Sequence, residues 1–267
     1  MLFDLNGFAR PGIKSRVFSK TPGGYYKLEQ PEVNYSEVLK NSSEFGDVDL
    51  NIGANAFQAA CESLKKSIEE SIDYRNILKG VHIPFITRKI KLNIDLGEDL
   101  ESNDLLHYQQ SFNSKFPERR FKAILQGNSE LIGNISIDPR SRYDKFLEKC
   151  HSGTVIGWYF PQVLQEFDIE SQREQMTCFP EFDNICLSGG LDVLAALIGS
   201  PDLLLNENFY SPILCLSSYL HKDPRLVLLL KAYGPHMEFW CMTQMLTNGV
   251  TQVSEQWSGG LTIYRSL

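Results

Sequence analysis

The sequence lacks a surplus of basic residues. Its 26 lysines and arginines are outnumbered by 33 aspartates and glutamates, which gives a formal net charge of −7. A protein that binds nucleic acid by neutralising phosphates needs a surplus of lysine and arginine on one face. We therefore expect no nucleic acid among the partners of this chain.

Long apolar segments are also missing. Apolar runs such as residues 226–230 fall far short of the roughly 18 residues that a membrane-spanning helix requires. Residues 1–6 lack the basic and apolar stretches of a secretory signal peptide. We therefore expect no membrane association and no export.

The six cysteines form no CxxC pair, and three of them, Cys186, Cys215 and Cys241, lie in apolar segments. In a chain of this size without a secretion signal, such cysteines are more often reduced and buried than bridged. This cysteine pattern favours a reducing compartment, and we interpret the protein as cytoplasmic.

Metal-binding and catalytic motifs are absent as well. No two of the five histidines stand at the i, i+3 or i, i+4 spacing of a helical metal site, and no Cys/His cluster has zinc spacing. Cys150 and His151 are the one adjacent thiol and imidazole, but neighbouring side chains usually point apart. The sequence predicts no metal site and leaves any cofactor unknown.

The composition is that of a globular protein, with 42% hydrophobic and 11% aromatic residues. Residues 1–50 nevertheless show neither helical nor strand periodicity. They contain Pro-Gly turns, including Pro22-Gly23-Gly24, with aromatic residues between them: Phe3, Phe8, Phe18, Tyr25 and Tyr26. A free tail would usually lack these aromatics, so we expect an extended arm tied to the body or to a neighbouring chain.

Residues 51–180 predict an α+β portion. The clearest element is an amphipathic helix over 55–78, because apolar residues recur there at steps of three and four. The other elements expected here are a strand over 90–96, a helix over 103–113, a hairpin of 120–125 with 131–137, a helix over 141–150, a strand over 154–160 and a helix over 162–176.

Residues 181–267 predict a βαβ-like portion. The expected order is a strand near Ile185, a helix over 192–198, a strand over 213–216, a helix over 224–233, a strand over 237–242 and a terminal strand over 261–264. The strands are continuously apolar, which is typical of parallel strands covered on both faces. The fold class is therefore α+β or mixed α/β, and we expect this portion to pack with residues 51–180 as one domain.

The sharpest local signal is the sequence Leu-Ser-Gly-Gly-Leu-Asp at 187–192, between a short apolar strand and a helix. It resembles the pyrophosphate-binding loop of the PP-loop ATP pyrophosphatases, in which Ser-Gly-Gly-x-Asp-Ser follows a strand. The resemblance implies a phosphate-binding role, but this chain has Val193 where the family has a hydroxyl residue. The alternative is that Gly189 and Gly190 form a tight turn and Asp192 caps a helix.

His221 and Lys222 follow the predicted strand over 213–216, at the sheet edge where open α/β folds bind ligands. If the strands are parallel, Ser188 and Asp192 lie on the same edge. The candidate catalytic residues are therefore Ser188, Asp192 and His221. The candidate ligand-binding residues are Gly189, Gly190 and Lys222. Alternatively, loop ends are polar because water surrounds them.

Two functional hypotheses follow. The first, slightly favoured, is a non-catalytic assembly or interaction subunit that binds a protein partner or a second copy through its N-terminal arm. The second is an α/β enzyme or a protein that binds a phosphate, nucleotide or carboxylate at the glycine turn over 188–192.

Overall fold

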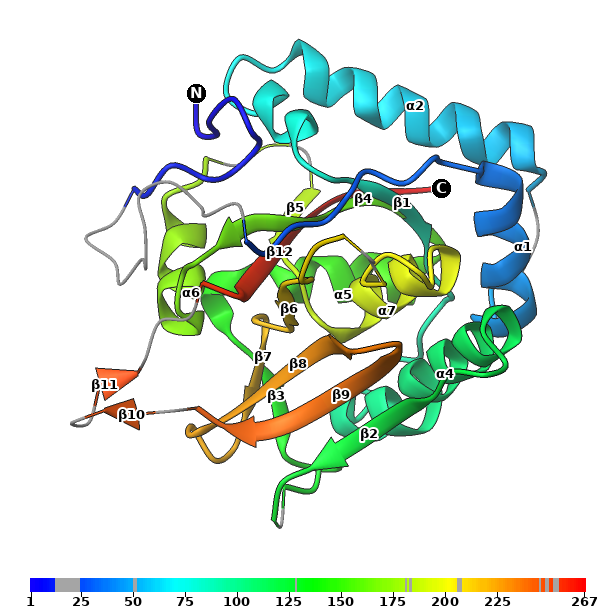
Figure 1. The fold of residues 1–267 in the computed structure, drawn as a ribbon. Helices are drawn as coiled ribbons and strands as arrows, with labels where there is room; N and C mark the ends of the chain where they lie inside the picture. The colour runs from blue at the N-terminus through cyan, green and yellow to red at the C-terminus, as the bar shows by residue number, and fades with distance from the viewer. Residues whose placement is uncertain are drawn as a thin grey trace.

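The computed structural model describes residues 1–12, 25–49, 52–127, 129–180, 182, 184–205, 208–244, 246–247, 250–251 and 255–267. They form an α+β fold around a mixed eight-stranded sheet, ordered β1-β4-β12-β6-β8-β9-β2, in which β5 also pairs with β12 (Figure 1). Its strands are β1 (Ile83–Ile86), β2 (Phe121–Leu125), β4 (Val155–Gln165), β5 (Asn184–Leu187), β6 (Ile213–Cys215), β8 (Leu226–Tyr233), β9 (His236–Thr243) and β12 (Trp257–Ser266). This is the predicted fold class.

Two further strand pairs and seven α-helices complete the described structure. The strand pairs are β3 (Ile135–Ile137) with β7 (Tyr219–His221), and β10 (Leu246–Thr247) with β11 (Val250–Thr251). The helices are α1 (Tyr35–Phe45), α2 (Ala54–Glu70), α3 (Leu96–Asp99), α4 (Leu105–Lys115), α5 (Tyr143–Ser152), α6 (Ile169–Thr177) and α7 (Gly190–Gly199), with short 3-10 or π turns at η1 (Arg75–Lys79), η2 (Leu100–Asp104) and η3 (Pro139–Ser141). No helix within these ranges is long and apolar enough to span a membrane.

The long antiparallel pair β4 and β12 forms the centre of the sheet. Every residue of β4 is buried, because one face packs on α2 and the other on α5 and α7 (Figure 1). Trp158 and Phe160 belong to the cluster that includes α2, whereas Tyr159 belongs to the cluster of α5 and α7. Residues 155–161 of this strand are apolar throughout because both of their faces are covered.

Helix α2 confirms the periodicity argument. Its predicted apolar stripe, Phe57, Cys61, Leu64 and Ile68, is buried against the sheet. The helix ends at Glu70, before the predicted end at residue 78, and Ile72 beyond it is exposed. The predicted helices over 103–113 and 141–150 correspond to α4 and α5.

Two predictions in the middle of the chain are wrong. Residues 90–96 form no strand, because the Asp95 carboxylate accepts the amides of Gly97 and Glu98 and so starts α3. The predicted hairpin is also absent, since β2 pairs in parallel with β9 and β3 pairs with β7. Each half of the hairpin finds a partner from the last third of the chain.

The predicted helix over 162–176 forms only in its second half. Strand β4 continues through Gln165, and the chain then turns at Glu166, whose φ is 69°. The carboxylate of Asp168 accepts the amide of Ser171 and starts α6. The long buried strand therefore extends five residues past the predicted end at Phe160.

The C-terminal portion begins with the predicted strand, helix and strand, which are β5, α7 and β6. They do not form a parallel pair, because β5 is antiparallel to β12 whereas β6 is parallel to it. The predicted helix over 224–233 is strand β8, which forms a hairpin with β9. Residues 227–230 of β8 are buried on both faces, so this apolar run resembles part of a buried helix.

The N-terminal segment is tied to the body of its own chain, and it is not extended throughout. Phe3 is buried against Tyr74 and Phe179, and the Ala9 amide donates to Val163 O at 2.8 Å. Helix α1 occupies the end of the predicted arm, where the Asn34 side chain accepts the Glu37 amide. Phe18 and the turn at Pro22 lie outside the described residues. All six cysteines are free thiols, as predicted.

Candidate functional site

The predicted glycine turn joins β5 to α7 in the interior of the protein. Ser188, Gly189, Gly190 and Asp192 are all buried. A Cβ on Gly189 would lie 2.6 Å from the Tyr143 ring, and a Cβ on Gly190 would lie 2.8 Å from the Tyr219 ring. Glycine is therefore needed here because two tyrosine rings pack on the turn.

The first turn of α7 is capped by the protein itself. The Tyr143 hydroxyl accepts the amides of Leu191 and Asp192 at 3.1 and 3.4 Å and donates to Asp192 Oδ1 at 2.9 Å. A helix N-terminus presents such amides to anions. The position that a bound phosphate would take at this helix is therefore filled by a phenol oxygen.

The Asp192 carboxylate completes this buried network. Its Oδ1 also accepts the Gly189 amide at 2.9 Å, and its Oδ2 accepts the hydroxyl of Thr262 from β12. Ser188 Oγ lies 2.9 Å from the same Thr262 hydroxyl. Burial raises the pKa of Asp192 above its ordinary value, and these donors act against the rise. The structure therefore gives Asp192 the helix-capping role that was the alternative to a ligand site.

The structure brings Ser188 and Asp192 together but gives the other two candidates different surroundings. His221 lies in β7, where its Nε2 is 3.1 Å from Glu130 O and its Nδ1 accepts the Asp223 amide at 2.9 Å. Lys222 is exposed, and its amide donates to Asn134 O. The catalytic and ligand-binding roles of these residues stay predictions.

The surface of the protein is hollowed on both sides of arm residues 25–28. This segment is fixed at four points. The Tyr26 and Tyr210 backbones form a parallel bridge, and the Lys27 amide donates to Tyr210 O at 2.9 Å. Gln162 Oε1 accepts the Leu28 amide at 3.2 Å, and Gln165 Nε2 donates to Tyr26 O at 3.0 Å. Both glutamines belong to the part of β4 that was predicted to be a helix, so sequence reasoning missed this role.

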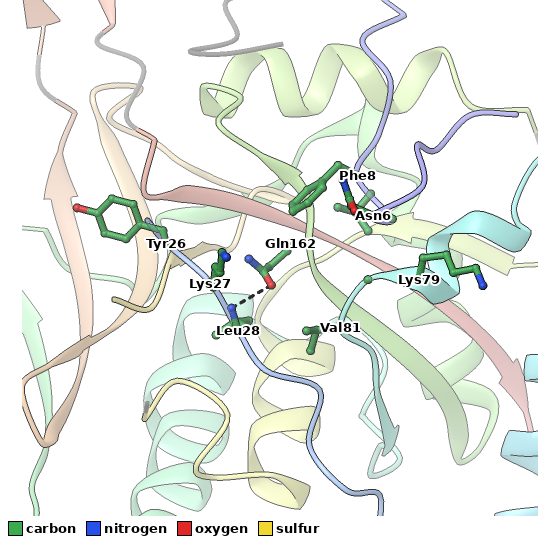
Figure 2. Close-up of a pocket in the computed structure, with 11 residues that line it drawn as sticks. Asn6, Phe8, Tyr26, Lys27, Leu28, Lys79, Val81 and Gln162 are labelled. Atoms are coloured by element: carbon green, nitrogen blue, oxygen red, sulfur yellow. Dashed lines mark hydrogen bonds between the residues drawn. The ribbon is translucent and has the colours of Figure 1, made fainter. Parts of the chain in front are cut away.

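One hollow, the arm pocket, has a volume of about 350 Å³ and lies between residues 6–8, residues 26–28 and β4. Figure 2 shows the Leu28–Gln162 hydrogen bond on one side, with Phe8 and Asn6 opposite. Lys79 lies at the margin, and its amine points away from the other labelled residues (Figure 2). The pocket is a seam between the arm and the body.

Three aromatic residues form an exposed surface beside this seam, which we call the aromatic ledge: Tyr25, Phe209 and Tyr210. The side chains of Tyr25 and Tyr210 are 56% and 63% exposed, and their rings stack with centroids 5.1 Å apart at an angle of 16°. Lys27 Nζ lies 5.3 Å from the centre of the Phe209 ring. The ledge joins the arm to the loop before β6.

The second hollow, the groove, has a volume of about 810 Å³. Its apolar lining includes Val227 and Leu229 of β8, Met242 of β9 and Trp257 of β12. Lys231 of β8 lines it as well. This volume lies within the range of about 300–1,000 Å³ that is usual for ligand pockets. Sequence reasoning missed Lys231 because residues 224–233 were expected to be helical.

The remaining clusters of ionisable residues have structural explanations. Arg88 forms buried ion pairs with Asp99 and Asp104 at 2.6 and 3.0 Å. Burial raises the pKa of Cys150 to about 12, and its thiol lies 3.5 Å from the Thr87 hydroxyl. Within the described ranges, no group of three or more His, Cys, Asp or Glu could hold a metal ion.

Comparison with protein-family models, with curated proteins and with solved structures finds no match to this chain.

Proposed function

We propose that this chain is a non-catalytic interaction protein that binds a protein partner through the aromatic ledge. One observation carries the proposal: Tyr25 of the arm and Tyr210 of the body are stacked, yet more than half of each side chain is exposed. Aromatic rings with a polar tip are enriched among the residues that dominate binding energy at protein interfaces.

The ledge is ordered before any partner arrives. Backbone bonds between Lys27 and Tyr210, and the glutamines of β4, hold the arm segment in place. A surface whose rings are already positioned loses little side-chain freedom on binding, and this favours affinity. The arm therefore supports binding by holding one half of the aromatic pair.

The location of the protein is part of the same proposal. Six free thiols support a reducing compartment such as the cytoplasm. The second hypothesis, an enzyme or a phosphate-binding protein centred on residues 188–192, requires the Tyr143 ring to leave the turn, since its hydroxyl occupies the helix N-terminus. The packing of Tyr143 on the glycine turn therefore favours the first hypothesis, binding through the ledge.

The test compares capture of partners from extracts of the native host cells by three tagged forms of the chain. The ledge variant carries Tyr25→Ser and Tyr210→Ser. The matched control carries Tyr233→Ser, which removes a tyrosine that is 67% exposed on the β8–β9 hairpin. We expect a stoichiometric partner, or a second copy of the chain, with the wild type and the control, and its loss with the ledge variant.

Equal capture by all three forms would contradict the proposal, as would a wild-type chain that stays at its monomer mass of 30.4 kDa and retains no partner. Melting curves of the three forms are recorded first. Because the substituted rings are exposed, we expect their stabilities to agree within about 0.5 kcal/mol per site.

A further inference from the structure

We infer that the groove is a binding site for an organic anion with an apolar body, whose charged group is held by Lys231. This inference concerns a different ligand class from the protein partner of the ledge, and it does not depend on that partner.

The groove lies on the outer face of the β8–β9 hairpin. The inner face, which includes Leu228, Leu230 and Phe239, belongs to the main core with α4, α5 and α7 (Figure 1). On the outer face, Val227 and Leu229 are also buried, because they pack in a smaller cluster with Trp257. The same two residues line the groove.

The apolar floor of the groove is assembled from three strands. Val227 pairs with Met242 across the hairpin, and Leu229 pairs with Trp240. Trp257 of β12 packs in the same cluster as Val227 and Leu229. An apolar floor in a hollow of about 810 Å³ suits a ligand with an apolar body.

Lys231 marks one end of this floor. Its Nζ lies 4.3 Å from the centre of the Trp240 ring and 3.7 Å from Glu238 Oε2, and its side chain is 25% exposed. Glu238 Oε2 also accepts the indole N–H of Trp240 at 2.8 Å. The ammonium group is thus held over a ring at a fixed place beside the floor.

Two lysines flank the single carboxylate of Glu238. Lys231 of β8 and Lys122 of β2 stand in register with Glu238 from its two sides. The described lining residues of the groove include Lys231 and no carboxylate, although the chain as a whole is acidic. An anionic group entering the groove therefore meets positive charge at the end of an apolar surface.

Hydrogen-bonding side chains also line the groove: Ser211, Thr243 and Gln244. Thr243 pairs with Leu226, at the end of the hairpin away from Lys231, so it can contact only the far part of a long ligand. An apolar floor with one fixed cation at its end fits a fatty carboxylate or an alkyl phosphate. The shared chemistry is an anionic head on an apolar chain.

The test titrates three probes of equal chain length into the full-length protein: decanoate, decyl phosphate and decanol. Calorimetry and tryptophan fluorescence follow binding, since Trp257 lines the groove and Trp240 stacks with Lys231. We expect saturation of one site by at least one of the two anions, and binding of decanol weaker by about tenfold or more, because decanol cannot form a charge-assisted contact with Lys231. The stronger of the two anions identifies a carboxylate or a phosphate head.

Two variants of Lys231 and one control make the result specific. Lys231→Gln should weaken the anions by about tenfold or more and leave decanol unchanged, while Lys231→Arg should retain anion binding. The control is Lys65→Gln, since Lys65 lies over the Trp158 ring, 5.4 Å from its centre, in a different part of the protein. Failure of both anions to saturate one site, or equal binding by wild type and Lys231→Gln, would overturn the inference.

A Tyr25→Ser variant separates this inference from the proposed function. Phe209 and Tyr210 of the ledge also line the groove, whereas Tyr25 does not. We expect this variant to bind the probes as the wild type does, whatever the outcome of the partner-capture experiment. Probe binding that disappears in Tyr25→Ser would contradict the assignment of the anion site to the groove.

Discussion

A single hydroxyl group explains the most conspicuous motif of the sequence. The Tyr143 phenol bonds to two amides and one carboxylate oxygen at the start of α7, and its ring fills the space beside Gly189. The Ser-Gly-Gly turn therefore serves the packing of a tyrosine that lies 49 residues away from Asp192. No local pattern at residues 187–192 reveals such a distant partner.

Removing this hydroxyl tests its role. Tyr143→Phe leaves two buried amides without their acceptor and removes one of the two donors to Asp192 Oδ1, so we expect a loss of roughly 1–3 kcal/mol in the free energy of unfolding. The matched control is Tyr159→Phe. Tyr159 is also buried, but its hydroxyl has no hydrogen-bond partner among the described residues, so its removal should be neutral or slightly stabilising. Urea unfolding of the two variants measures the difference. An equal loss in both would show that the Tyr143 hydroxyl does not stabilise the turn.

At the scale of elements, hydrophobic periodicity predicts an element correctly where one of its faces is buried and the other is exposed. Helix α2 has a clear stripe with charged residues between, and the sequence shows it directly. Strand β8 is different. Residues 226–230 are apolar on both faces because the main core lies on one side and a smaller buried cluster with Trp257 lies on the other. A continuous apolar run of this kind carries no period, so the helix predicted over 224–233 could not be distinguished from a strand.

Strand pairing was harder to predict than strand position. The segments 120–125 and 131–137 were recognised as extended, but their partners β9 and β7 lie about a hundred residues further along the chain. The same limit applies to the candidate surface. Gln162 and Gln165 hold the arm from a strand that was expected to be helical, and Tyr210 contributes half of the ledge from a loop without any motif.

The N-terminal segment docks on the body through Phe3. Its ring is fully buried, with its centre 5.5 Å from that of Phe179 and 5.7 Å from that of Tyr74. We expect Phe3→Ala to lower the free energy of unfolding by about 3–5 kcal/mol. Leu5→Ala in the same segment is the control, because Leu5 is 78% exposed and its truncation should change stability by less than about 0.5 kcal/mol. Thermal unfolding of both variants measures this, and a loss in Phe3→Ala as small as that in Leu5→Ala would show that the segment is not docked.

At the scale of the whole molecule, the buried hydrogen-bond network and the exposed candidate binding surfaces lie in different places. The glycine turn, Asp192 and the long pair β4 and β12 lie inside, where their polar groups bond to one another. The ledge and the groove lie outside, around arm residues 25–28 and the β8–β9 hairpin. The arm was expected to mediate binding and to be tied either to the body or to a neighbouring chain. In the structure its described residues are bound to the body, and they contribute by completing a surface there.

Hydrogen exchange tests directly whether the captured partner binds at the aromatic ledge. Exchange is compared between the free chain and the isolated complex. We expect slower exchange in peptides covering residues 25–29 and 208–212, and unchanged exchange over α2. Protection confined to other surfaces, with residues 25–29 and 208–212 exchanging as in the free chain, would contradict it.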